Sequence, residues 1–339
     1  MELVKENVTV NQVSCKGDTQ VLVDEDIIVP DVKPDILKIL QLDAVSCITN
    51  KEITNGRVNV TGRVDLKILY IPDSDREKVK SIITSFDFTQ NVDSKNITDD
   101  MTAIIMANVD RAEFSLINSR KLRIKVIVGL DYEVVAEKNV EIAVEAEDCD
   151  NAELLKENVK LQNCIGLTET EFSVKEAIEV PNGQTSINEI LKVDTKISDS
   201  EYKAVTGKIV VKGEISVCVL YTDSDCCIQF MESEVPFTEI IDCDDAGDET
   251  ICDIDYSLSD VRYQITEDND GDNRIVDIDV TVTTQVKATE NVKEMNVDRP
   301  ITLEKGGEDN SRVLYLYRPL TIAESGALTL KGGVFFYPY

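Results

Sequence analysis

Closely spaced carboxylates between residues 266 and 277 could hold a divalent cation. The stretch reads TEDNDGDNRIVD, and with Gly271 at the sixth position of a calcium loop, two aspartates fall at positions three and five. Position one is then threonine and position twelve is aspartate, where the calcium pattern has aspartate and glutamate. The segment is therefore more typical of a polar loop, and it predicts at most a weak calcium site. The candidate ligands are Asp268, Asp270, Asp272 and Asp277.

The residue types that most catalytic and metal sites need are scarce in this sequence. Histidine is absent from all 339 residues, which removes the commonest general base, nucleophile activator and metal ligand. Nine cysteines are present, but none are spaced as C-x-x-C, so a zinc site has little support. A second acidic stretch, DCDDAGDETICDID at 242–255, lacks ligand spacing and is typical of a solvated loop. We therefore expect a protein that is not an enzyme and that needs no cofactor.

The stretch VPDVKPDILKIL, residues 29–40, is the other arrangement that could do chemistry, because an aspartate stands beside each of its two prolines. The same residues could instead form a corner of the fold, since proline suits a turn or the first turn of a helix. After Pro34, the apolar residues Ile36, Ile39 and Leu40 have the i, i+3, i+4 spacing of one helix face. This spacing predicts a short helix whose apolar face packs on a sheet.

An internal repeat distinguishes the two interpretations of this stretch. Residues 2–70 align with residues 153–221 at a constant shift of 151 positions, with 21 identities in 69 positions, so the chain contains the same module twice. The second copy keeps the first proline and the apolar residues, whereas asparagine and serine replace the two aspartates. This pattern indicates architecture rather than catalysis. The residues assigned to the structural motif are Pro30, Pro34, Ile36, Ile39, Leu40, Gly62 and Tyr70 in the first copy, and Pro181, Ile187, Ile190, Leu191, Gly213 and Tyr221 in the second.

Most of the remaining sequence has the pattern of β-strands. GRVNVTGRVDLKILY at 56–70 and its copy GKIVVKGEISVCVLY at 207–221 alternate apolar and polar residues and are rich in β-branched side chains, as half-buried strands do. Gly62 and Gly213 inside these strands predict a bulge or a close backbone approach. We expect a mainly β chain of two tandem antiparallel β-sandwich modules, each with a short helix after the V-P-x-x-x-x-x-I-x-x-I-L motif.

The motif V-P-D-V-K-P-D-I-x-K-I-L, followed by the strand pair G-x-V-x-V-x-G-x-V-x-x-x-I-L-Y, resembles the SPOCS domain. That domain occurs, often in tandem, in sporulation proteins of clostridia and their relatives, including the SipL type, which links the coat to the forespore surface. The first module matches the motif well, and the second is a divergent copy without the second proline and its aspartate. SipL-type proteins end in a LysM module marked by G-D-T-L-W-x-I-A, and no such segment occurs here. The resemblance implies a structural protein whose motif carries no known chemistry.

The repeat divides the chain into two modules and a tail. We expect a first SPOCS-like module at residues 1–150, a divergent second one at 151–298, and an aromatic-rich tail at 299–339. The tail holds six of the chain's 18 aromatic residues (10 Tyr, 8 Phe and no Trp), together with two strand-like runs, VLYLY and GVFFYPY. We expect the tail to pack within its own chain, and the alternative is that it adds a strand to a neighbour's sheet.

Charge and hydropathy limit the partners and the location. A formal net charge of −30 argues against nucleic acid and anionic membrane surfaces, since both are bound by clustered Lys and Arg. The N-terminal residues MELVKENVTV have no apolar core of a signal peptide, and no run of about 18 apolar residues predicts a membrane span. We therefore expect a cytoplasmic protein, which the resemblance would place in the mother cell, at the forespore surface or in the spore coat.

These expectations combine into one preferred function and one alternative. The preferred function is a structural scaffold in spore-coat or spore-envelope assembly that acts through protein–protein contacts of its tandem β modules. The implied partners are spore-coat morphogenetic proteins, and self-association is a further option. The alternative is an acidic calcium- or carbohydrate-binding β-sandwich protein.

Overall fold

The computed structural model of the protein describes residues 2–74, 78–147 and 152–303, together with four short strands between residues 314 and 336. Strands make up nearly all of these residues, and none of them forms a helix. The first half contains β1 (Glu2–Ile28), β2 (Ile36–Thr54), β3 (Arg57–Pro72), β4 (Lys80–Asp93), β5 (Thr102–Asn118) and β6 (Lys121–Glu147). The second half contains β7 (Ala152–Glu179), β8 (Glu189–Val205), β9 (Lys208–Thr222), β10 (Ile228–Asp242), β11 (Ile251–Glu267) and β12 (Asn273–Leu303).

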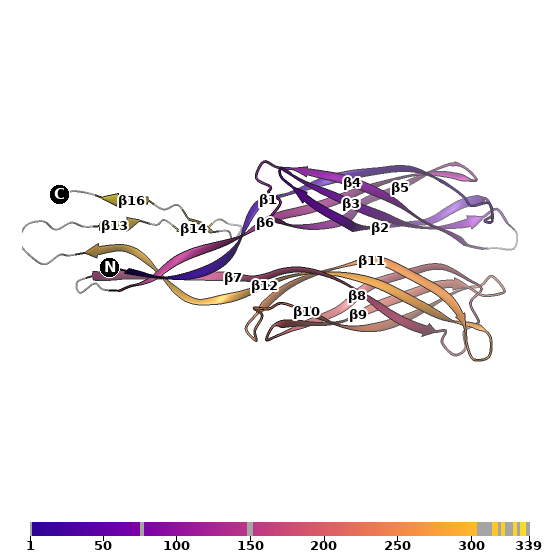
Figure 1. The fold of residues 1–339 in the computed structure, drawn as a ribbon. Coiled ribbons are helices and arrows are strands. Elements are labelled where there is room, and N and C mark those ends of the chain that lie inside the picture. The colour runs from indigo at the N-terminus through magenta and orange to yellow at the C-terminus, as the bar shows by residue number, and fades with distance from the viewer. Residues whose placement is uncertain are drawn as a thin grey trace, which may run out of the picture.

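Each half is a sandwich of two three-stranded antiparallel sheets (Figure 1). In the first half, β2-β3-β4 form a meander that packs on the sheet β1-β6-β5, and in the second half β8-β9-β10 pack in the same way on β11-β12-β7. The expected mainly β chain with two tandem antiparallel halves is confirmed. The expected boundary between residues 150 and 151 lies outside the described residues.

The repeat found in the sequence is also a repeat of strand pairing. Val23 of β1 is opposite Val126 of β6, and Val174 of β7, which lies 151 positions after Val23, is opposite Val280 of β12. The alternation in β3 places every second side chain in the core, where the ring of Tyr70 and five aliphatic side chains are completely buried. Those five are Val58, Val60, Val64, Leu66 and Ile68. Burial of this kind contributes roughly 1.5–3 kcal/mol for each large aliphatic side chain, so the meander strand anchors each sandwich.

The glycines inside the central strands allow a close approach by neighbouring groups. A Cβ added to Gly62 would lie 2.2 Å from the ring of Phe88 and 2.7 Å from the carbonyl oxygen of Cys47. At Gly213 the same atom would lie 2.5 Å from Phe237 and 2.6 Å from the carbonyl oxygen of Asp199. Any larger residue at either glycine would therefore have to displace an aromatic ring and a neighbouring strand.

The short helices predicted after the V-P motif are wrong, because β2 begins directly at Ile36. Its pairing with β3 skips one residue between Ile36 and Lys38 and one between Ile39 and Gln41. Each β-bulge adds one residue to the strand, so the inward-facing Ile36 and Ile39 are three positions apart although the backbone is extended. The first bulge therefore gives these two isoleucines the i, i+3 spacing of a helix face, and the second bulge follows directly after Ile39.

The bulges also correct the predicted position of Leu40. Leu40 is the extra residue of the second bulge and is 48% exposed, whereas Ile39 is 8% exposed. In the second copy the bulge recurs after Ile190, but there the extra residue, Leu191, is completely buried. The two copies therefore share the backbone irregularity and use its side chain differently.

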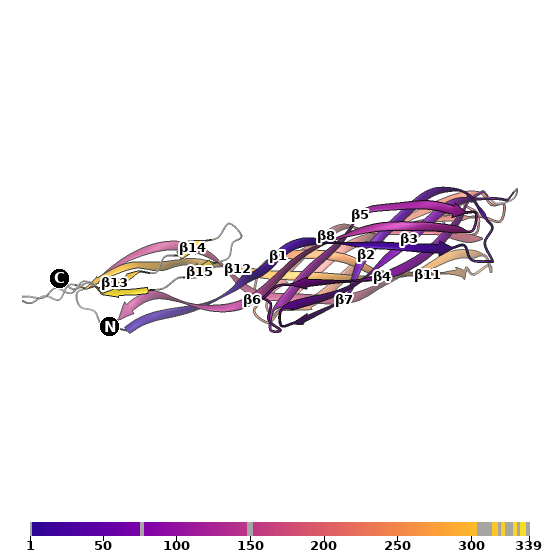
Figure 2. The same ribbon diagram turned by 90° about the horizontal axis from the view of Figure 1, so that it is seen from above.

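In each sandwich the central strand of one sheet and one of its neighbours continue beyond the sandwich as a long two-stranded ribbon. β1 pairs with β6 as far as Glu2 and Glu147, and β7 pairs with β12 as far as Ala152 and Leu303. Figures 1 and 2 show that both ribbons leave from the same end of the molecule. Where they meet, the backbone N–H of Thr9 donates to Asn163 Oδ1 at 2.9 Å. The ribbons thus join the two halves beyond one end of the sandwiches.

The described residues of the tail form two short two-stranded sheets, one nested within the other in chain order. β13 (Leu314–Tyr317) pairs with β16 (Gly333–Phe336), and β14 (Leu320–Ile322) pairs with β15 (Leu328–Leu330). The two strand-like runs of the sequence therefore pair with each other. Packing of this tail on its own chain stays a prediction.

The bulge predicts that substitutions at the adjacent residues Ile39 and Leu40 change the free energy of unfolding by very different amounts. Ile39→Asp places a carboxylate in the first core and should lower the free energy of unfolding by about 3–5 kcal/mol. Leu40→Asp, one residue along the strand, should change it by less than about 1 kcal/mol because the side chain already contacts water. Urea unfolding of both variants measures the difference. Equal losses would contradict the bulged strand and would favour a helix face.

Candidate functional site

An arginine fills the turn formed by the V-P motif. The Arg120 guanidinium, from the β5–β6 turn, donates to the carbonyl oxygens of Val29 and Pro30 at 3.1 Å each. It also contacts the Asp35 carboxylate at 2.6 Å. The turn joins β1 in one sheet to β2 in the other, so its carbonyls have no neighbouring strand to pair with. The arginine satisfies these acceptors and fixes the crossing of the chain between sheets.

Asp35 is held on both sides by the same turn. It accepts hydrogen bonds from Arg120 and from the Ser119 hydroxyl, the latter at 2.8 Å. The hydrogen bond from Arg120, followed by that from Ser119, holds the pKa of Asp35 below its usual value. Its partner Asp31 lies 3.4 Å from Arg120 but has a fully exposed side chain. The two aspartates therefore act as ligands of one guanidinium, an arrangement that stabilises a turn and offers no general acid.

The second module builds the same turn without the aspartates. Arg274 donates to the carbonyl oxygens of Val180 at 3.0 Å and Gln184 at 2.8 Å. Buried tyrosines support both turns from below: Tyr70 donates to the carbonyl oxygen of Pro34 at 3.1 Å, and Tyr221 contacts the Gln184 side chain at 3.0 Å. The arginine and the tyrosine, rather than the aspartates, are the groups that both copies retain.

Sequence reasoning missed both arginines. Arg120 and Arg274 are 154 positions apart, whereas the aligned region is offset by 151, so they fall after the point where the ungapped alignment ends. Each directly precedes or begins the long strand that returns to β1 or β7. An arginine at the start of this strand in both copies was the available signal.

The structure does not bring the four calcium candidates together. Asp268 Oδ1 accepts the backbone N–H groups of Asp270 at 2.9 Å and Asp272 at 3.0 Å, which closes the loop on itself. Asp277 lies in β12, four residues beyond Asn273 and roughly 13 Å along the strand. Among the described residues no three His, Cys, Asp or Glu side chains are grouped as metal ligands.

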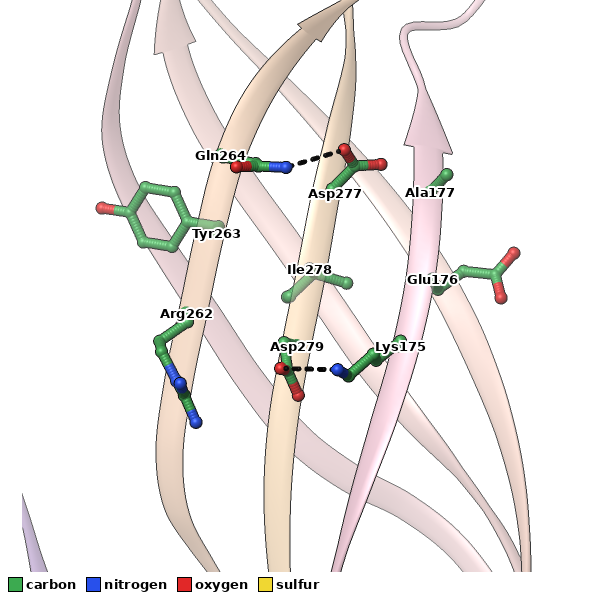
Figure 3. A pocket seen from close by; sticks show the side chains of 9 residues that line it. All are labelled: Lys175, Glu176, Ala177, Arg262, Tyr263, Gln264, Asp277, Ile278 and Asp279. Atoms are coloured by element: carbon green, nitrogen blue, oxygen red, sulfur yellow. Dashed lines mark hydrogen bonds and ion pairs between the residues drawn. The ribbon is translucent and has the colours of Figure 1, made fainter.

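Asp277 instead lies on the outer face of the sheet formed by β7, β12 and β11, beside a shallow depression of about 570 Å³ (Figure 3). There it accepts a hydrogen bond from Gln264 at 3.2 Å, and Asp279 pairs with Lys175 at 3.4 Å. Lys175 and Asp279 thus neutralise one another, whereas Asp277 is held by a neutral amide. The depression contains no nucleophile beside a base and offers no support for catalysis.

The largest polar arrangement lies between the two sandwiches. Basic side chains of the first module meet acidic side chains of the second, with one pair of the reverse sense. A groove of about 700 Å³ runs between the facing edges, lined by β2 and β5 on one side and by β8 and β11 on the other. The pairs are Lys51–Glu169, Lys67–Asp194 (3.2 Å), Lys80–Glu189 (2.6 Å), Lys33–Glu189 (3.8 Å), Arg63–Asp260 (3.5 Å) and, in reverse, Lys192–Asp43.

Lys192 is the most buried charged group of this contact, at 9% exposure. Burial alone would lower its pKa, but hydrogen bonds to Asp194 and Asp43 outweigh burial and raise it. Burial likewise acts to raise the pKa of Asp43, and the hydrogen bond from Lys192 reverses this. Lys192 and Asp43 are therefore both charged at neutral pH, and their attraction holds β8 of the second module against β2 of the first.

Comparison with known proteins identifies a domain in each half. Residues 35–117 and 186–266 each match the family model described as SipL, SPOCS domain. No curated protein and no solved structure matches the chain. The matched segments run from the end of the V-P turn to β5 in the first module and from the end of the equivalent turn to β11 in the second, so the long strands β1, β6, β7 and β12 lie outside them. Within the described residues, no helix could span a membrane.

The depressed pKa of Asp35 predicts how a variant responds to acid. A lowered folded-state pKa contributes stability that is present above the unfolded pKa of about 3.9 and is lost as pH falls through the folded value. Asp35→Asn should therefore be less stable than the natural protein at pH 6, and the gap should close below about pH 4. Melting temperatures from pH 6 to pH 2 test this. Asp31→Asn, at the exposed neighbour, is the control and should follow the natural protein, and a constant gap for Asp35→Asn would contradict the arginine-held turn.

The ion pairs between modules predict compensation by a charge swap. Lys51→Glu should destabilise the protein because it sets two carboxylates side by side at Glu169. Adding Glu169→Lys to the same chain should restore part of the loss, with a coupling energy of roughly 0.2–1 kcal/mol for a partly exposed pair. The recovery should shrink in 1 M salt, where screening acts over about 3 Å. Strictly additive effects of the two changes would show that the modules do not meet there.

Proposed function

We propose that this chain, whose two halves each match the SPOCS domain, is a sporulation-related protein and a non-enzymatic scaffold of the spore coat or spore envelope. It would act in the mother cell at the forespore surface, through protein–protein contacts of its two β modules. Its partners would be other proteins of the assembling coat.

The observation that carries this proposal is the fixed contact between the two modules. Ion pairs join β2 and β3 of the first module to β8 of the second, and a hydrogen bond joins the two ribbons. Together they give the two sandwiches one defined relative position. A flexible tether would let each module bind independently, whereas a fixed pair presents its outer surfaces at a constant spacing. Constant spacing is what an ordered assembly requires from a component that does no chemistry.

The surface of the described residues supports binding rather than catalysis. In the depression on the outer face of the second module, Lys175 and Asp279 form an ion pair with one another. This depression is shallow, and histidine is absent from the chain. Several large apolar side chains are nevertheless exposed on strands of both modules, among them Leu37, Phe230 and Ile240. Exposed apolar side chains gathered into patches are typical of surfaces that bind other proteins.

The proposal is tested by location and by dependence on the module contact. A fluorescently tagged copy in a sporulating clostridial cell should gather around the forespore and remain in the isolated coat fraction. A chain with Lys51→Glu and Lys67→Glu should be made but retained less, and the further changes Glu169→Lys and Asp194→Lys should improve its retention. A signal spread evenly through the mother cell for the natural protein would contradict a scaffold function.

A further inference from the structure

A patch of exposed apolar side chains lies at the turn end of the first module. Its members come from two strands, β2 and β5, and their exposed fractions range from 42% to 63%. The described residues of the second module expose fewer large apolar side chains, and those come mainly from β10. The patch consists of Leu37, Leu40, Phe114, Leu116 and Ile117.

Two observations place the two halves of this patch side by side. At the tip, the backbone N–H of Ile36 donates to the carbonyl oxygen of Ser119 at 2.8 Å. Further along, residues 44–46 of β2 line the same groove as residues 107–109 of β5. The two strands therefore run antiparallel along one edge of the sandwich, and Leu37 and Leu40 lie between these points opposite Phe114, Leu116 and Ile117.

Three of the five side chains are the extra residues of β-bulges. The pairing of β2 skips Leu37 and Leu40, and the pairing of β5 skips Ile117. A bulge re-aims a side chain that a regular strand would turn the other way. Three bulges at one place that all carry apolar residues outward indicate a surface shaped for contact.

The fold itself does not need this patch, because the second module lacks it. Asn188 replaces Leu37, and Leu191, the counterpart of Leu40, is completely buried. Tyr263 and Ile265, which pair with β12 as Phe114 and Leu116 pair with β6, pack against the second core. The same positions are thus polar or covered in one copy and apolar and exposed in the other.

The patch continues an edge that already makes a contact between modules. Residues 44–46 of β2 and 107–109 of β5 face residues 195–197 of β8 and 254–258 of β11 across the groove. Residues 195–197 are the counterparts of 44–46, shifted by 151 positions. The groove therefore lies between equivalent edges of the two modules, and the patch lies on the first of these edges, toward the turn end and beyond the residues that line the groove.

We infer that this patch binds the same patch of a second copy of the chain, so that two chains associate through the β2–β5 edges of their first modules. The occupant is another copy because the molecule already pairs this edge with its own equivalent. The patch residues carry no charge, so the contact brings apolar surface together. This association of two chains needs no other component and does not depend on the proposed function.

Charge determines how this association depends on salt. Each chain carries a formal charge of −30, so two copies repel one another at low ionic strength. Salt shortens the screening distance from about 10 Å at 0.1 M to about 3 Å at 1 M, and it leaves apolar contacts in place. Association through the patch should therefore strengthen as salt rises, whereas a contact between an acidic and a basic surface would weaken.

Sedimentation of the full chain over a range of protein and salt concentrations tests the inference. As the protein concentration rises, the mass of the natural protein should increase from the monomer value of 37.8 kDa to twice that value. The increase should occur at a lower protein concentration in 1 M salt than in 0.1 M salt. The variant Leu40→Glu with Phe114→Glu should associate about 30-fold more weakly or worse, as expected when central anchors of an interface are lost. The matched control is Ile83→Glu with Ile240→Glu, which adds the same charge at exposed sites on β4 and β10 and should associate like the natural protein.

The outcomes separate the patch from other contacts. A natural protein that stays monomeric at all salt concentrations would overturn the inference, as would a patch variant that associates like the control. Equal melting temperatures for the patch variant and the control would show that the loss of association does not result from unfolding. A photoreactive amino acid in place of Leu37 should cross-link to β2 or β5 of the second copy, and a cross-link to β10 or to the tail would overturn the patch-to-patch contact.

Discussion

The closing of a turn around an arginine is the interaction on which each module depends. A sandwich forms only if the chain leaves one sheet and enters the other at a defined place, and Arg120 sets that place by holding the carbonyl oxygens of Val29 and Pro30. The same group comes from the strand that returns beside β1, so one side chain ties together the end of β1, the start of β2 and the start of β6. Arg274 repeats this in the second module with different neighbours. The motif in the sequence is therefore the outer half of a structural joint, and the arginine is its inner half.

The sequence pattern predicted the strands and the repeat because both depend on side-chain alternation over many residues. The helix failed for a local reason: a β-bulge at Leu37 set Ile36 and Ile39 three residues apart, and spacing alone does not separate a bulged strand from a helix turn. Leu40 failed with it, since in this copy the extra residue of the bulge points away from the core, whereas its counterpart Leu191 is buried. The arginines were missed because each is a single residue beside the start of a strand, beyond the ungapped alignment, where no periodicity marks a residue that binds carbonyl groups.

Neither the side-chain alternation nor the internal repeat predicted the ion pairs between the modules, because these pairs depend on which surfaces of the two modules face each other in space. They show how the two copies have diverged. Lys67 of β3 contacts Asp194 of β8, and the counterpart of Lys67 in the second module is Cys218. The aspartate is present in both copies, as Asp43 and Asp194, while the basic partner is present in one. Divergence at a few surface positions thus turned two similar modules into a donor and an acceptor that fit one another.

The paired ribbons at the terminal end have a mechanical consequence. In each ribbon the antiparallel strands end together, at Glu2 beside Glu147 and at Ala152 beside Leu303. A pulling force applied across such an end separates the strands one hydrogen bond at a time, as a zipper opens, and never loads the whole ladder at once. The ribbons would therefore yield at low force while both sandwiches, with their buried cores, stay folded. A chain under tension would lengthen at this end by a reversible peeling of its ribbons, which would make it a compliant link between whatever its termini and its modules hold.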